Sequence, residues 1–115
     1  LNMKKLLFIA LLVLPFLTFA QSPCDSDICV IQFNAGWNNA NSVDWLEKLT
    51  DCGILNVDIV SDPDAQKEHE IVVVPTIIVF NGKEVKRFQA DISFSMKATK
   101  KDIQNTIDEI LMSGF

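Results

Sequence analysis

The sequence predicts an α/β fold in which a mixed central sheet of about four strands is flanked by helices. Apolar runs rich in β-branched residues alternate with segments that carry helical spacing or helix-start signals. The dipeptide Asn81-Gly82 then joins two strand-like segments, which is the strongest short signal for a hairpin. The order strand, helix, strand, helix, strand, strand, helix places one sheet between helices.

The first strand is expected over Ile28–Phe33, where a mostly apolar run indicates burial on both faces. Residues 34–41 form a turn-forming cluster around one tryptophan. From Ser42 a helix is expected, which Gly53 would end. Its inward side chains recur at helical spacing, with Trp45 beside them in the core: Val43, Leu46 and Leu49.

Ile54–Val60 reads as a second buried strand. Asp62 and Pro63 then form a typical helix start, with a capping carboxylate followed by proline in the first helical position. This helix is expected to be short and to end near Glu70. We expect His69, close to that end, at the surface.

Thr76–Phe80 and Glu84–Phe88 are the two strands of the expected hairpin. Residues 90–98 carry no clear signal. Thr99–Asp102 reads as a capping box that opens the last helix. The apolar residues expected on one face of that helix are Ile103, Ile107, Ile110 and Leu111.

Length, composition and charge exclude several classes of protein. A chain of 115 residues fits one domain, and a hydrophobic content of 49% excludes a disordered chain. Ten Lys and Arg face fifteen Asp and Glu, so nucleic acid is not expected as a partner.

The N-terminal 20 residues have the pattern of a secretory signal peptide. Met3-Lys4-Lys5 precedes an uncharged apolar run over residues 6–19, and cleavage is expected after Ala20. The alternative is a retained membrane anchor, but the run is shorter than the roughly 20 residues that a span needs. We therefore expect a domain over residues 21–115, periplasmic or secreted, without membrane contact after cleavage.

Four motifs, in order and at matching intervals, give the chain its resemblance to a known family. They are Phe33-Asn34-Ala35-Gly36-Trp37, Asp62-Pro63, Val74-Pro75-Thr76 and Phe80-Asn81-Gly82-Lys83. Residues 28–89 resemble the thioredoxin family, and residues 99–111 resemble its closing helix, which implies a thioredoxin-like fold. The resemblance also implies that Pro75 follows a cis peptide bond and that the Val74 backbone can pair with an extended peptide. The family's first strand and helix have no counterpart.

The residues that carry the family's chemistry are replaced. Asn38-Asn39-Ala40-Asn41 stands where the family has Cys-x-x-Cys. The position of the family's buried Asp holds Gln32, and that of an assisting Lys holds Asn56. Because an amide can neither form nor break a disulfide, the resemblance implies no thiol–disulfide exchange at this turn.

Asn38 and Trp37, two residues of the turn, each allow two interpretations. Asn38 can cap the following helix through its amide oxygen, or it can contact a bound peptide. Trp37 can pack over the turn or take part in recognition. Asn39 and Asn41 are expected to be solvated.

Three cysteines, Cys24, Cys29 and Cys52, leave the disulfide pairing open. A structural disulfide can join Cys24 to Cys29 or involve Cys52. Free buried thiols and a catalytic or regulatory disulfide are the alternatives. Neither the cysteine spacing nor the acidic residues form a metal-binding pattern, so no metal or other cofactor is expected.

The sequence therefore predicts an exported thioredoxin-like domain without the Cys-x-x-Cys centre. Its expected role is non-catalytic binding of an extended peptide or protein segment across Trp37, Val74 and Pro75 by strand addition. One alternative is a thiol–disulfide oxidoreductase or isomerase that uses Cys24, Cys29 or Cys52. Another is a structural or dimerisation module. The oligomeric state is not set by the sequence.

Overall fold

The computed structural model of the chain describes residues 24–113, so the predicted signal peptide and its cleavage site lie outside the described residues. Its elements follow in the order β1 (Ile28–Asn34), the 3-10 helices η2 (Gly36–Asn41) and η3 (Leu46–Lys48), β2 (Gly53–Asp58), α2 (Pro63–Glu68), β3 (Thr76–Asn81), β4 (Lys83–Gln89) and α3 (Lys100–Ser113). Within this described range, no helix has both the length and the apolar character needed to cross a membrane.

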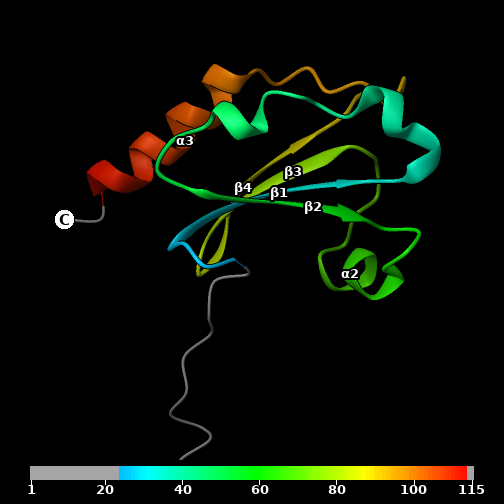
Figure 1. The fold of residues 1–115 in the computed structure, drawn as a ribbon, viewed down its shortest axis with the longest axis horizontal. Coiled ribbons are helices and arrows are strands. Elements are labelled where there is room, and N and C mark those ends of the chain that lie inside the picture. The colour runs from blue at the N-terminus through cyan, green and yellow to red at the C-terminus, as the bar shows by residue number, and fades with distance from the viewer. Residues whose placement is uncertain (1–23, 114–115) are drawn as a thin grey trace, which may run out of the picture.

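A mixed four-stranded sheet in the order β2-β1-β3-β4 forms the centre of the molecule. β1 pairs with β2 in parallel and with β3 in antiparallel orientation, and β3 pairs with β4 in antiparallel orientation. Figure 1 shows η2, η3 and α3 over one face of the sheet and α2 on the other. The predicted α/β fold class is confirmed.

Alternate side chains of the central strands β1 and β3 supply the core on both faces of the sheet. Val30 and Val79 pack on the face covered by α3, with Ile103 and Ile107 of that helix. The side chains on the α2 face are Cys29, Ile31, Phe33, Ile78 and Phe80, with Ile71 and Val74 from the segment after α2. All seven residues of β1 are buried, as its apolar run predicts.

The helix expected after Ser42 does not form. Only the short helices η2 and η3 lie between β1 and β2. Residues 38–44 contain three Asn, one Ser and one Asp, whose side chains compete with the backbone for hydrogen bonds and disfavour a helix. Leu46 and Leu49 are nevertheless buried, and Trp45 packs against them partly buried, so the predicted inward side chains do point inward.

β2 is an edge strand, so its prediction as a buried strand is wrong. Its central residues Leu55 and Asn56 are exposed. A central position in the sheet, or a helix packed along it, would be needed to bury them, and neither is present in residues 24–113. Gly53 begins β2 and does not end a helix. A Cβ atom at Gly53 would lie 2.6 Å from the Cys24 sulfur, so glycine leaves room for that side chain.

The predicted helix starts are confirmed. The Asp62 carboxylate accepts a hydrogen bond from the Ala65 N–H at 3.1 Å, with Pro63 in the first turn of α2. At α3, the Asp102 N–H donates to the Thr99 hydroxyl at 3.2 Å and the Thr99 N–H to the Asp102 carboxylate at 2.8 Å. The expected inner face of α3 holds for the buried Ile103 and Ile107 and for Ile110, which packs against the core partly buried, but Leu111 is exposed.

The hairpin is confirmed, with Gly82 alone between the two strands at a φ of 82°. Residues 90–98 form an irregular loop organised by the Asp91 carboxylate. This carboxylate accepts hydrogen bonds from the Ser93 hydroxyl and from the N–H groups of Ser93 and Ser95. The loop carries Phe94 to the turn after β1.

Candidate functional site

The turn Gly36–Asn41 sits at the C-terminal end of β1 and presents Trp37 to solvent. The Trp37 residue is 66% exposed. Its ring meets Phe94 edge-on, with ring centroids 5.3 Å apart and an interplanar angle of 86°. Such T-shaped pairs are favourable beyond simple burial, so the loop 90–98 fixes one side of the indole.

Asn38 is buried and joins four parts of the chain. Its amide nitrogen donates to the Asn34 side-chain oxygen at 3.1 Å, to the Val74 carbonyl at 3.3 Å and to the Phe94 carbonyl at 3.4 Å. Its side-chain oxygen accepts from the Asn41 amide at 2.8 Å. This network holds the turn against the segments before Pro75 and around Phe94.

The capping role considered for Asn38 is wrong, because η2 begins after Ala35 and shows no side-chain cap. With no α-helix after the turn, no helix N-terminus stands there to stabilise a negative charge. Asn39 and Asn41 are exposed, in agreement with the sequence. Their side chains still take part in local hydrogen bonds, Asn39 with Ser42 and Asn41 with Asn38.

The Val74–Pro75 peptide bond is cis, as the resemblance implies. Both residues are buried beside the turn, and the Val74 carbonyl already accepts the Asn38 amide. The Val74 N–H has no acceptor among residues 24–113. The backbone before Pro75 therefore keeps an unpaired donor, while its acceptor is used within the chain.

Gln32 and Asn56 form a hydrogen-bonded pair below the turn. The Gln32 amide donates to the Asn56 side-chain oxygen at 2.9 Å, and its own oxygen accepts the Val43 N–H at 2.9 Å. The family resemblance places the family's buried acid and assisting base at these two positions. Because amides do not titrate, this pair offers no proton acceptor at neutral pH.

A polar hollow of about 360 Å³ opens between this pair and the turn. Asn39 and Ser42 line it from the turn, and Asn56 and Asp58 line it from β2. Asp58 is the only charged residue among the described residues that line it, so the hollow favours a polar or cationic group.

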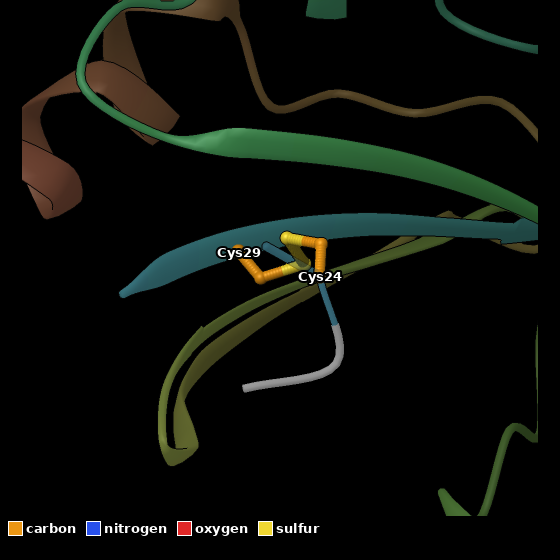
Figure 2. The surroundings of a disulfide bond; sticks show 2 residues. All are labelled: Cys24 and Cys29. Atoms are coloured by element: carbon orange, nitrogen blue, oxygen red, sulfur yellow. A yellow bond between two sulfur atoms is a disulfide. The ribbon is translucent and has the colours of Figure 1, made fainter. Parts of the chain in front are cut away.

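The cysteines lie at the opposite end of β1 from the turn. Figure 2 shows the disulfide that joins Cys24 to Cys29 at the start of the strand. Cys29 is fully buried and Cys24 is partly exposed. The sequence left this pairing open, and the structure assigns it.

Cys52 carries the thiol that remains outside the disulfide. It packs with the core on the α3 face, whereas Cys24 and Cys29 pack with the core on the α2 face. Burial raises the pKa of the Cys52 thiol, and the Asp51 carboxylate raises that pKa further. The protonated thiol is a weak nucleophile, and the sheet separates it from the disulfide.

His69 is partly exposed, as its expected surface position requires, but its ring also packs against two core phenylalanines. The ring centroids lie 5.1 Å from Phe33 and 5.4 Å from Phe80. Its carbonyl also accepts a hydrogen bond from Arg87 at 2.8 Å. Among residues 24–113, no group of three or more His, Cys, Asp and Glu side chains is arranged to hold a metal ion.

Sequence reasoning missed Phe94 and Asn34 as members of the site. Phe94 reaches the turn from a loop with no clear pattern, at a left-handed φ of 63°. Asn34 was visible as a polar residue at the end of a buried strand. Its amide donates to the Asn38 carbonyl at 3.2 Å and to the Ser42 hydroxyl at 2.6 Å.

Comparison with solved structures identifies the fold. A mutant thioredoxin from Halobacterium salinarum aligns with a TM-score of 0.60 and 19% identity, over 74% of this chain and 75% of that chain. Thioredoxin from Schistosoma mansoni aligns with a TM-score of 0.58 and 18% identity, over 76% and 80% of the two chains. Thioredoxin from Fasciola hepatica aligns with a TM-score of 0.53 and 25% identity, over 71% and 79%. The sequence matches no family model and no curated protein. The fold of the described chain is thioredoxin-like.

Proposed function

We propose that this thioredoxin-fold domain is a non-catalytic module that binds an extended peptide or protein segment across Trp37, Val74 and Pro75. The observation that carries the proposal is the 66% exposed Trp37 on a turn that hydrogen bonds hold against the segment before Pro75. Tryptophan is enriched among the residues that dominate binding energy at protein interfaces. A rigid support lowers the entropy lost when such a side chain engages a partner.

The backbone of Val74 could pair with an extended partner through only one of its two hydrogen-bonding groups. The Val74 N–H has no acceptor within the described chain, so strand addition would require a partner carbonyl to reach this donor at a residue that is 4% exposed. The Val74 carbonyl is bonded to Asn38, so it does not offer the second bond of a regular ladder. Trp37 would therefore contribute most of the affinity, and backbone pairing would set the direction of the peptide.

Phe94 covers part of the surface that the peptide would use. Its ring packs on Trp37, and its carbonyl is bonded to Asn38. A peptide that lies along Trp37 must replace the phenyl contact or pack beside it. We expect Phe94→Ala to change affinity without abolishing binding, because Trp37 and the turn remain in place.

The test is selection of random peptides against the purified domain, followed by titration of the selected peptide by isothermal calorimetry. Trp37→Ala should weaken binding by at least about tenfold, since hot-spot truncation costs about 2 kcal/mol or more. Met112→Ala is the matched control, because this apolar side chain on α3 is 80% exposed and distant in sequence. Retained affinity in folded Trp37→Ala would exclude the proposed groove.

A second candidate function is thiol–disulfide exchange, and the Cys24–Cys29 disulfide is the observation that favours it. A partner thiolate could attack the sulfur of Cys24, a partly exposed residue, to form a mixed disulfide and release Cys29 as a thiolate. Against this role, Cys29 lies within β1 and not at a helix N-terminus, which would stabilise a thiolate.

An insulin-reduction assay with dithiothreitol separates the two functions. The binding module should give no turnover above dithiothreitol alone. Turnover that disappears in a Cys24→Ser, Cys29→Ser double variant, and persists in Cys52→Ser, would establish the redox function instead.

A further inference from the structure

The two edge strands of the sheet, β2 and β4, are protected to different degrees from pairing with other chains. β4 carries Lys83, Lys86 and Arg87, and its pairing with β3 contains an irregularity at Val79/Phe80. Basic side chains and bulges are features that keep edge strands from pairing with other chains. β2 has the sequence Gly-Ile-Leu-Asn-Val-Asp, without a basic residue, a proline or a register shift. The β2 edge is the unprotected one within residues 24–113.

The two faces of β2 differ in chemistry. Leu55 and Val57 pair with Ile31 and Phe33 and therefore lie on the α2 face of the sheet. Leu55 is 38% exposed, so a strand added beside it would cover it further. Asn56 and Asp58 stand on the opposite face, where they line the 360 Å³ hollow below the turn. A strand paired with β2 would meet apolar groups on one face and a polar, anionic hollow on the other.

Charge is also unevenly distributed along the chain. Residues 24–70 contain ten Asp and Glu against two Lys, whereas residues 71–113 contain five acidic against six basic residues. The acidic part includes β2 and both of its ends, with Asp51 before the strand and Asp58 at its last position. The potential around this edge is therefore negative and attracts a cationic partner.

We propose that the outer edge of β2 is a docking site for an extended segment of a partner protein with alternating apolar and basic residues. Its apolar side chains would cover Leu55 and Val57, and its basic side chains would lie along Asn56 and Asp58. One of them would enter the hollow and meet the Asp58 carboxylate. This surface uses neither Trp37 nor Pro75, so the inference is independent of the proposed function.

A second copy of the chain is a poorer occupant of this edge. Two β2 strands brought together would place two acidic regions side by side, and like charges at that spacing repel. A basic segment gains both the backbone ladder and the charge complementarity.

The experiment is a fluorescence-polarisation titration of the full chain with a labelled peptide of alternating valine and lysine, beside the valine–glutamate counterpart. We expect the lysine peptide to bind and the glutamate peptide to bind at least about tenfold more weakly. Leu55→Lys should reduce affinity for the lysine peptide by about tenfold or more, because it places a charge on the edge. Val85→Lys is the matched control, since Val85 is an exposed apolar residue of the other edge strand.

The contribution of the acidic side chains to binding is tested with separate substitutions. These also test the proposal if Leu55→Lys fails to fold. Asp58→Asn keeps the oxygen that accepts the Val60 N–H at 2.9 Å while removing the charge. Combined with Asp51→Asn, it should weaken lysine-peptide binding and flatten its salt dependence. Equal affinity for both peptides, or equal effects of Leu55→Lys and Val85→Lys, would overturn the proposal. So would a dimer by sedimentation that Leu55→Lys dissociates, because a second copy would then occupy the edge.

Discussion

Asn38 is a buried polar side chain that hydrogen bonds connect to several parts of the chain. Its amide hydrogens reach three acceptors, and its oxygen accepts from Asn41. A buried amide with partners on all sides is stabilising, whereas losing one partner leaves buried polar groups unsatisfied. The turn is thus held by hydrogen bonds where the family resemblance implies a reactive sulfur.

The close packing of Gly53 against Cys24 can be tested with a single substitution. In Gly53→Ala the new Cβ would lie 2.6 Å from the Cys24 sulfur and 3.1 Å from the Ser26 hydroxyl oxygen. The disulfide holds that sulfur in place, so the strain has little room to relax. We expect a loss of about 1–3 kcal/mol in the free energy of unfolding, measured by urea denaturation.

Gly36→Ala is the control for this substitution. A Cβ at Gly36 would meet its nearest atom, an Asp58 carboxylate oxygen, at 3.4 Å, which is an ordinary contact. Its effect should stay within about 0.5 kcal/mol, as for most substitutions away from tight packing. Equal losses in both variants would show that the Cys24 contact does not set the cost at Gly53.

In the loop 90–98, the Asp91 carboxylate accepts hydrogen bonds from Ser93 and Ser95. Hydrogen bonding from the Ser93 side chain lowers the pKa of Asp91 to about 2, and the N–H groups of Ser95 and Ser93 and the Lys97 ammonium also lower it. A lowered pKa in the folded loop means that the ionised carboxylate stabilises it. This contribution is complete above the ordinary Asp pKa of about 4 and is lost as the pH falls through about 2.

We therefore expect the contact between Phe94 and Trp37 to loosen between about pH 4 and pH 2. The measurement is the indole N–H resonance of Trp37 followed by NMR during an acid titration. Asp91→Asn should shift this resonance toward its acid position at neutral pH and remove the transition. A resonance that is constant over this range in the unmodified protein would refute the role given to Asp91.

The segment between β1 and β2 shows that apolar spacing and helix formation are separate properties. Leu46 and Leu49 reach the core as predicted, yet the backbone forms only η2 and η3. Asn and Ser side chains satisfy the backbone and one another locally, which removes the advantage of a regular helix.

At the scale of the whole molecule, local signals predicted most of the fold. The buried run of β1, the Asp62–Pro63 helix start, the Thr99–Asp102 capping box and the Asn81-Gly82 hairpin are all present in the structure. Each depends on residues close together in sequence. Whether β2 is buried depends on what lies beside it in space, and its own sequence does not contain that information.

The candidate site was harder to predict for the same reason. Trp37 and Pro75 are visible in the sequence because they belong to short motifs. The role of Asn38 depends on carbonyl groups 36 and 56 residues away. Local patterns therefore located the turn but could not predict which atoms hold it.

The disulfide contributes to the stability of the whole domain. Cys24–Cys29 closes a loop of only five residues in sequence separation, and a loop this short restricts the unfolded chain modestly. Reduction should therefore lower the free energy of unfolding by about 2 kcal/mol while leaving the sheet intact. Urea denaturation of the Cys52→Ser variant, with and without reductant, measures this difference without thiol exchange. Identical curves would contradict the prediction.

His69 is the only histidine in the chain, and its ring lies between Phe33 and Phe80. The circulating π-electrons of two neighbouring phenyl groups displace the resonances of its ring protons from their free-solution frequencies. The ring-proton resonances of His69 therefore report whether the end of α2 is packed against the sheet. Spectroscopists can follow local opening of this side of the molecule without any introduced label.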